Sequence, residues 1–177
     1  MNDSTSNLDP VLFQGKIFNV VERTQKGRDG RPLKRQIVKH PGAVGIVPIL
    51  PDGRVLLIEQ YRASFEQILF EIPAGTREKG EAPETTAQRE LVEETGYRVG
   101  QMEMLTPIYT SPGILQEELI IYLATDLTEG QSAPELGELI TLAPKTWEEI
   151  DEMLRRRTIM DAKTIVGLLL AKQRLEI

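Results

Sequence analysis

The stretch that decides the fold runs from Gly75 to Tyr97 and has the sequence GTREKGEAPETTAQRELVEETGY. Pro83 suits the first turn of a helix, and Gly96 suits the position just after a helix end. We therefore expect a helix between these two residues, preceded by a loop rich in glycine and charged side chains.

Three carboxylates share one face of this predicted helix. Glu90, Glu93 and Glu94 sit at i, i+3 and i+4. Like charges at this spacing repel, at a cost of about 0.2–0.5 kcal/mol per pair. A solvated acidic helix face is the ordinary explanation of such a run. A hard divalent cation such as Mg²⁺ takes carboxylate oxygens and would offset the repulsion, so the pattern also indicates a metal site.

The spacing of the whole stretch resembles the Nudix box. Gly75 is followed after five residues by Glu81, and after seven more by the Arg-Glu pair that begins the acidic run. The positions that match the box are Gly75, Glu81, Arg89, Glu90, Glu93, Glu94 and Gly96. Tyr97 departs from it, because the family more often has an aliphatic residue there.

Motifs outside the box resemble the ADP-ribose pyrophosphatase subgroup of Nudix hydrolases. That subgroup has a proline sixteen residues after the closing glycine of the box, and Pro112 lies at that distance from Gly96. The other matching segments are His40–Val44, Glu59–Arg62, Glu71–Gly75, Ser111–Gly113 and Asp161–Thr164. GDP-mannose hydrolases of the same superfamily share much of this pattern.

The resemblance implies a fold, an assembly and a reaction. The fold would be α/β (α+β), an α/β/α sandwich with a mixed β-sheet. Residues 1–39 would form an N-terminal β-hairpin exchanged between the subunits of a homodimer, and residues 40–177 would form the Nudix hydrolase domain. The reaction would be Mg²⁺-dependent hydrolysis of a nucleoside diphosphate sugar, with Mn²⁺ as a substitute. ADP-ribose would give AMP and ribose 5-phosphate.

Composition is that of an ordinary globular domain and excludes several kinds of site. The net charge of −6 over 177 residues argues against a nucleic-acid surface. There are no cysteines, which excludes disulfides and thiol chemistry, and the single histidine, His40, excludes a histidine-rich metal site. No apolar run reaches the length of a membrane span and the N-terminus lacks a signal pattern, so we expect a cytoplasmic protein.

Apolar and turn-forming residues predict the remaining elements. The stretch 11–23 is β-like, a turn covers 26–31, and 33–39 is a second strand, which together make the N-terminal hairpin. Further strands are expected at 43–50, 54–60 (the return strand after a turn at 51–53), 68–72, 98–109, 118–125 and 139–142. Helices are expected at 146–157 and 161–175. This order of elements predicts one α/β or α+β sandwich.

Hydrolysis of a pyrophosphate needs charge neutralisation and a positioned water, which metal ions can supply. We predict Glu90 and Glu94 as the first metal ligands and Glu93 as the third. The resemblance adds the main-chain carbonyl of Ala74, just before the box glycine, as a further hard ligand.

Arg89 and Glu81 have more than one predicted role. We include Arg89 in the catalytic set as an organising residue, because it can pair with Glu93 at i+4 or reach back to Glu81 and hold the loop against the helix. Glu81 is alternatively a more distant metal ligand.

The general base is predicted on a late loop. The resemblance implies a glutamate from a mobile segment, and the stretch 129–138 offers Glu135 and Glu138. The usual pattern of an acid before a strand favours Glu138, and a small shift of the alignment favours Glu135. A base on a loop is physically reasonable, since closure would bring it to the water only when substrate is bound.

Substrate contacts are predicted from the same comparison. Arg62 follows a core strand, a suitable place for a phosphate contact, and its alternative is a surface salt bridge. Arg35 and Gln36 occupy positions that in the family reach the adenine bound by the partner subunit, and Pro112 and Gly113 lie at the subgroup motif. His40 is predicted as a packed or capping residue, and Trp147 as core.

Two hypotheses from other classes compete with an enzyme. One is a sensor that binds ADP-ribose-like ligands without hydrolysing them, which the intact box glutamates disfavour. The other is an interaction domain with a solvated acidic helix, which a Mg²⁺ titration would distinguish from a metal site.

Overall fold

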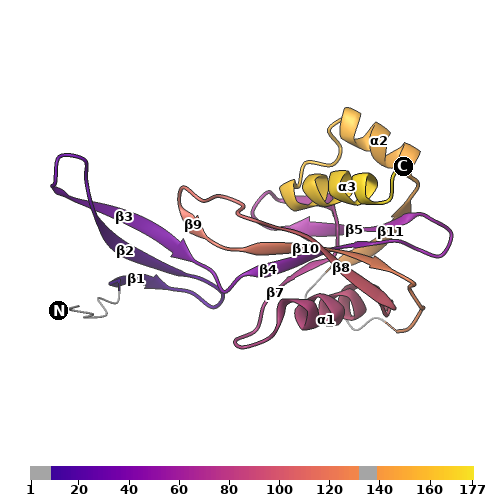
Figure 1. The fold of residues 1–177 in the computed structure, drawn as a ribbon, viewed down its shortest axis with the longest axis horizontal. Helices are drawn as coiled ribbons and strands as arrows, with labels where there is room; N and C mark the ends of the chain where they lie inside the picture. Colours follow the sequence, from indigo (N-terminus) through magenta and orange to yellow (C-terminus); the bar gives the residue numbers. More distant parts are fainter. Residues whose placement is uncertain (1–8, 132–138) are drawn as a thin grey trace. The chain divides into compact units, whose positions relative to one another are not determined.

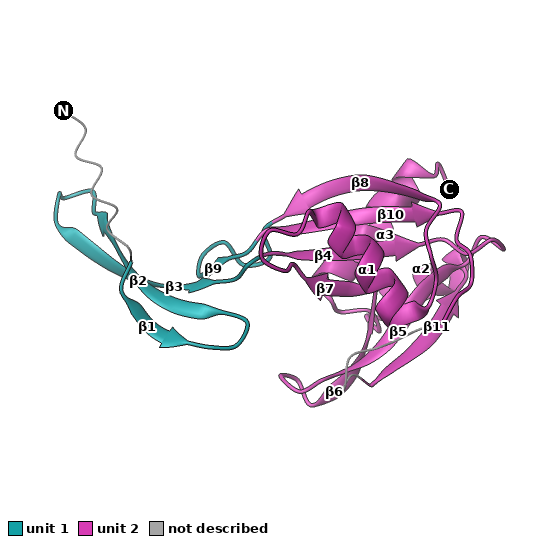
Figure 2. Cartoon of the chain, turned by 90° about the horizontal axis from the view of Figure 1, so that it is seen from below, with its two compact units in different colours: residues 1–41, 109–117 teal, residues 42–108, 118–177 magenta. Residues whose placement is uncertain are grey.

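The computed structural model describes residues 9–131 and 139–177, and the chain divides into two compact units (Figure 2). The smaller unit comprises the chain up to Pro41 together with Tyr109–Glu117. The larger unit comprises Gly42–Ile108 and Glu118–Ile177. The segment around Pro112 therefore belongs with the N-terminal strands.

One four-stranded sheet makes up the smaller unit, in the order β1-β2-β3-β9 (Figure 1). Its strands are β1 (Val11–Gln14), β2 (Asn19–Lys26), β3 (Pro32–Lys39) and β9 (Leu115–Gln116). β2 and β3 form the predicted antiparallel hairpin, and β9 pairs in parallel with β3. The sequence did not indicate this last pairing.

The predicted β-like stretch 11–23 is two strands rather than one, because the chain turns between β1 and β2. The Gly15 N–H donates to the Phe18 carbonyl oxygen at 2.9 Å, which closes a tight turn. A Cβ on Gly15 would lie 2.7 Å from that oxygen, so only glycine permits this close approach. The turn brings β1 back alongside β2 in an antiparallel pair.

Two sheets form the larger unit. The first has the order β7-β4-β10-β8, and its strands are β7 (Ala74–Thr76), β4 (Ala43–Pro48), β10 (Leu119–Thr125) and β8 (Gln101–Ile108). β10 pairs in parallel with β4 and antiparallel with β8, so this sheet is mixed. The second sheet is antiparallel, in the order β11-β5-β6, with β11 (Ile140–Lys145), β5 (Val55–Arg62) and β6 (Gln67–Glu71).

The expectation that β5 returns along β4 is wrong. Both edges of β4 are occupied: β10 pairs along one edge, and β7 pairs along the other, where the Ile46 N–H also donates to the Pro73 carbonyl at 2.8 Å. Only an isolated bridge between Ile49 and Val55 joins the two segments. β5 instead pairs with β6 and β11 in the second sheet.

The three predicted helices are present, and local capping explains their ends. They are α1 (Pro83–Thr95), α2 (Trp147–Arg155) and α3 (Ala162–Arg174). Gly96 ends α1 in the left-handed conformation, with φ 79°. Thr146 and Glu149 form a capping box at the start of α2, and the Asp161 side chain caps α3.

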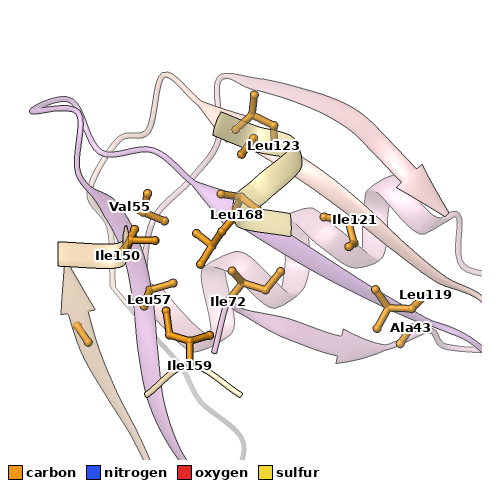
Figure 3. Close-up of a cluster of buried hydrophobic side chains, with 13 residues drawn as sticks. Ala43, Val55, Leu57, Ile72, Leu119, Ile121, Leu123, Ile150, Ile159 and Leu168 are labelled. Carbon is orange, nitrogen blue, oxygen red and sulfur yellow. The ribbon is translucent and has the colours of Figure 1, made fainter. Parts of the chain in front are cut away.

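Alternate residues of β10 face opposite sides of the first sheet, as a pleated strand requires. One set packs with α2 and α3, in a cluster that includes Leu119, Ile121, Leu123, Ile150 and Leu168 (Figure 3). The other set packs with α1, in a cluster that includes Ile120, Tyr122, Ala124, Ala87 and Leu91. Full burial of each large aliphatic side chain contributes about 1.5–3 kcal/mol. With α1 on one face and α3 on the other (Figure 1), the predicted α/β/α sandwich is confirmed.

None of the helices in the described ranges is long and apolar enough to cross a membrane. The cytoplasmic location stays a prediction.

Candidate metal and active site

The acidic helix α1 lies with its apolar side on the first sheet and its carboxylates beside β7. Leu91 is fully buried, which fixes the rotation of the helix about its axis. Glu90 and Glu94, on either side of Leu91 in the sequence, contact the Ala74–Gly75 segment of β7.

Glu94 is a buried carboxylate held by the backbone of β7. Glu94 is 4% exposed, and its Oε2 accepts a hydrogen bond from the Ala74 N–H at 3.0 Å. A buried carboxylate is costly unless such partners satisfy it. The contact places the Glu94 carboxylate next to the residue whose carbonyl group was predicted as a metal ligand.

Gly75 leaves the space in which the Glu90 carboxylate lies. A Cβ at this position would be 1.9 Å from the Glu90 Cδ, far inside van der Waals contact. The φ angle of Gly75 is outside the left-handed region, so close approach, and not backbone conformation, is the reason for glycine here. The glycine of the box is therefore part of the carboxylate site.

Arg89 organises the loop before the helix. Its Nε and Nη2 donate to the two carboxylate oxygens of Glu81 at 3.1 and 3.2 Å, and its Nη1 donates to Glu93 at 2.7 Å. Arg89 therefore makes both of the contacts that were predicted as alternatives, with Glu93 and with Glu81. The hydrogen bond from Arg89, with help from Thr86, lowers the pKa of Glu81 to about 2. The hydrogen bond to Glu81 and the nearby Glu90 and Glu93 raise the pKa of Arg89.

The donor set fits a hard divalent cation. Glu94 brings a carboxylate to Ala74 and Glu90 brings one to Gly75, and hard cations prefer carboxylate and carbonyl oxygens. Arg89 contacts Glu93 and also pairs with the Glu90 Oε1 at 2.9 Å, and Glu81 is engaged by Arg89 and Thr86. Accordingly, no group of three acidic or histidine side chains is gathered for a metal within residues 9–131 and 139–177.

Arg62 lies at the end of β5 and is paired with a buried carboxylate. Its Nε and Nη2 donate to the two oxygens of Glu71, each at 2.6 Å. This hydrogen bond raises the pKa of Arg62, and the charge of Glu94 acts in the same direction. The Arg62 side chain is 36% exposed. Its predicted phosphate contact stays a prediction.

Four residues that form one network with Arg62 have no role predicted from the sequence. They are Glu71, Asp161, Lys163 and Thr164, and all four lie in the matching segments Glu71–Gly75 and Asp161–Thr164. A carboxylate inside an apolar strand pattern, in the sequence ILFEIP, was the available signal, because such a residue is almost never buried unless it is paired.

The remaining predicted substrate residues belong to the smaller unit. Arg35 and Gln36 lie on β3, opposite Arg23 and Glu22 of β2 in the hairpin register. Pro112 and Gly113 lie in the turn before β9. These four residues are therefore in a different unit from the carboxylates of α1, and their roles stay predictions.

Two further predicted residues, His40 and Trp147, have the structural roles expected of them, and the two candidate bases are not described. His40 is paired through its Nδ1 with the Glu117 Oε1 at 3.0 Å, which agrees with a packed residue. Trp147 packs on the core, as expected. Glu135 and Glu138, the two candidates for the general base, lie outside the described residues.

Comparison with known proteins finds relatives along most of the chain. Residues 39–167 match the NUDIX domain family. An ADP-ribose pyrophosphatase of Bacillus subtilis (strain 168) is 38% identical over 155 residues, which cover 86% of this chain and 84% of that protein. A methanol dehydrogenase activator of Bacillus methanolicus is 38% identical over 158 residues, which cover 88% of this chain and 85% of that protein.

A solved structure has the same fold. The crystal structure of an ADP compounds hydrolase matches with a TM-score of 0.83, over 96% of this chain and 92% of the other. Its sequence is 20% identical, so the likeness concerns the fold alone.

Proposed function

We propose a reaction for this chain from one premise: it belongs to the NUDIX domain family. It is a hydrolase, and the bond that we propose it cleaves is the pyrophosphate bond of a nucleoside diphosphate sugar. ADP-ribose is the proposed substrate, with AMP and ribose 5-phosphate as products. The observation that carries the proposal is the placement of Glu90 and Glu94 against Ala74–Gly75, because it forms an oxygen-lined site for a cation that binds pyrophosphate.

Relatives support the substrate class more than the individual substrate. One relative at 38% identity is an ADP-ribose pyrophosphatase, and a second at the same identity has a different name. Identity alone therefore does not select the substrate, and GDP-mannose is the alternative that the sequence motifs leave open.

The charge of a pyrophosphate repels hydroxide, and a bound divalent cation both neutralises that charge and lowers the pKa of a coordinated water. We propose Mg²⁺, with Mn²⁺ as a substitute. Glu90, Glu94 and the Ala74 carbonyl would hold it, and Glu93 would join them if its carboxylate turned from Arg89. Arg89 keeps the loop and the helix together through Glu81.

Proton transfer from the attacking water is assigned to the segment before β11. Glu138 is the proposed base and Glu135 the alternative. A base carried by a loop can act after substrate binds, which limits unproductive chemistry in the free enzyme. Neither residue is one of the proposed metal ligands, so the assignment separates metal binding from proton transfer.

Arg62 is the proposed phosphate contact in the larger unit, because a guanidinium can donate two parallel hydrogen bonds to phosphate oxygens. Arg35 and Gln36 are proposed to contact the adenine, and Pro112 and Gly113 to border the substrate. All four of these belong to the smaller unit, and in the proposed homodimer Arg35 and Gln36 would reach the partner's site.

The homodimer is proposed from the surface of the smaller unit. Its β1–β3 region exposes large apolar side chains, namely Val11, Leu12, Phe13, Ile17, Phe18 and Leu33. A small sheet with so much exposed apolar surface is marginal by itself, and contiguous apolar surface marks an interface. A second copy of this chain is the proposed occupant, as the exchanged hairpin requires.

A substrate panel with Mg²⁺ tests the reaction. ADP-ribose, GDP-mannose, other nucleotide sugars and NADH are compared by the release of nucleoside monophosphate. We expect the highest kcat/KM for ADP-ribose, and AMP and ribose 5-phosphate as its products. Binding of ADP-ribose without turnover would refute the hydrolase and favour a sensor, and preference for GDP-mannose would refute only the substrate.

A further inference from the structure

Glu71 ends β6 as a carboxylate that is 1% exposed. Arg62 donates to it twice, and Lys163 forms an ion pair and a hydrogen bond with the same group. Burial alone would raise the pKa of Glu71, but Arg62 and Lys163 outweigh this effect and lower it. A buried ion pair is weak evidence for stability, so we look for the role of this network in the groups that it positions.

The network first sets the orientation of Arg62. A guanidinium is planar and has five N–H donors, and the pairing with Glu71 fixes the edge formed by Nε and Nη2. The plane of the group is therefore set, while 36% of the Arg62 side chain remains exposed. Glu71 lies three residues before Ala74, whose N–H donates to Glu94, so the guanidinium is paired next to the segment that forms the candidate metal site.

The network also fixes the position of Glu71 itself. Lys163 also pairs with Asp161, the cap residue of α3, at 3.1 Å. The Asp161 carboxylate accepts from the N–H and the hydroxyl of Thr164 at 2.9 and 2.6 Å, and the Thr164 hydroxyl accepts from the Ile72 N–H at 2.9 Å. The first turn of α3 thus fixes both the Glu71 side chain and the backbone that follows it.

We propose that Glu71 is a positioning residue: it holds the Arg62 guanidinium in the orientation that binds a phosphate group beside Glu94. The first turn of α3 acts as the fixed support for Glu71. The segment 72–74, which follows Glu71, is held at both ends. The Thr164 hydroxyl accepts from the Ile72 N–H, and the Glu94 carboxylate accepts from the Ala74 N–H. An arginine oriented in advance loses less conformational freedom on binding, which is why the support would increase affinity. The inference rests on the proposed function for its reaction.

The test compares Glu71→Asp, Arg62→Ala and the double variant with the wild-type chain. Glu71→Asp keeps the charge opposite Lys163 but retracts the carboxylate by one methylene, which disrupts the two-point contact with Arg62. Glu103→Asp is the matched control, because Glu103 is half exposed and pairs with Arg174 in another part of the larger unit. Binding of inorganic pyrophosphate without added metal is measured by calorimetry, and ADP-ribose hydrolysis by KM and kcat.

We expect Glu71→Asp to raise the pyrophosphate Kd and the ADP-ribose KM about tenfold to hundredfold, with a smaller change in kcat. In the Arg62→Ala background the same change should raise neither value further, because Glu71 acts through Arg62. Glu103→Asp should match the wild type. An unchanged Kd in Glu71→Asp, equal rises in both backgrounds, or no pyrophosphate binding by the wild type would overturn the inference.

Arg62→Lys keeps the inference testable if Glu71→Asp does not fold. A lysine retains the charge but cannot pair with Glu71 through a planar group, so its pyrophosphate Kd should approach that of Arg62→Ala. Wild-type affinity in Arg62→Lys would refute the need for an oriented guanidinium. A wild-type chain that hydrolyses no nucleotide sugar would refute the proposed function alone, and the pyrophosphate Kd values would then decide the role of Glu71.

Discussion

Replacing Gly75 by alanine should remove activity while leaving the fold in place. The new Cβ would lie 1.9 Å from the Cδ of Glu90, whereas carbon atoms in contact are about 3.5–4.0 Å apart. The Glu90 carboxylate must therefore move by about 1.5–2 Å. Glu90 is a long side chain and its end can rotate away, so the backbone of β7 does not have to shift.

The expected loss follows from that displacement. A misplacement of about 1 Å in a reacting arrangement costs about a hundredfold in rate, so kcat/KM of Gly75→Ala should fall at least about a hundredfold. Stability should change much less, because the φ angle of Gly75 is compatible with alanine and the clash is with a mobile group. Overpacking of about 1 kcal/mol would shift the Tm by about 2–4 °C.

The assay combines hydrolysis of ADP-ribose, calorimetric titration of Mg²⁺ and thermal unfolding. Glu90→Gln is the reference variant, and Gly75→Ala in that background should cause little further loss, since both changes remove the same carboxylate. Turnover near the wild-type value in Gly75→Ala would refute the role of Glu90 at the cation site. A fully additive double variant would show that Gly75 acts by some other route.

Four further predictions address the rest of the site and the assembly. Glu94→Gln should lower kcat about 10²–10³-fold and leave the Tm nearly unchanged, because the amide oxygen can still accept from Ala74. Glu138→Gln should lower kcat more than Mg²⁺ affinity; if Glu135→Gln does so instead, Glu135 is the base. Phe13→Asp should shift sedimentation from dimer toward monomer. Because the pKa of Glu81 is lowered to about 2, Arg89→Met should remove stability that the wild type has above about pH 4.5 and loses as the pH falls toward 2, as measured by Tm against pH.

Each of these predictions has an outcome that contradicts it. Near-normal turnover in Glu94→Gln would exclude it as a ligand. Met160→Asp is the control for the assembly, because Met160 is 58% exposed and Phe13 56% exposed. Equal effects of the two on sedimentation would contradict the proposed interface. Parallel Tm curves for wild type and Arg89→Met across the acid range would contradict the assignment of the Glu81 pKa to Arg89.

The parts of the fold that the sequence predicted depend on neighbours in the chain. α1 begins at Pro83 and ends before Gly96, as expected, because capping involves residues within one turn. The pair of Arg89 with Glu93 follows from the helical repeat. The strand partners did not follow in the same way: β5 is excluded from β4 because β7, which begins at Ala74, already occupies that edge.

By itself, the sequence determined the helices, most of the strands, the acidic face of α1 and the family. Periodicity, caps and motif spacing are all properties of residues that lie close along the chain. Only the tertiary structure decided which carboxylates approach Ala74 and Gly75, and that Arg89 contacts Glu81 and Glu93 together. It also brought Lys163 to Glu71 across 92 positions of sequence. The physical reason is that burial and ion pairing depend on packing between elements, which no local pattern encodes.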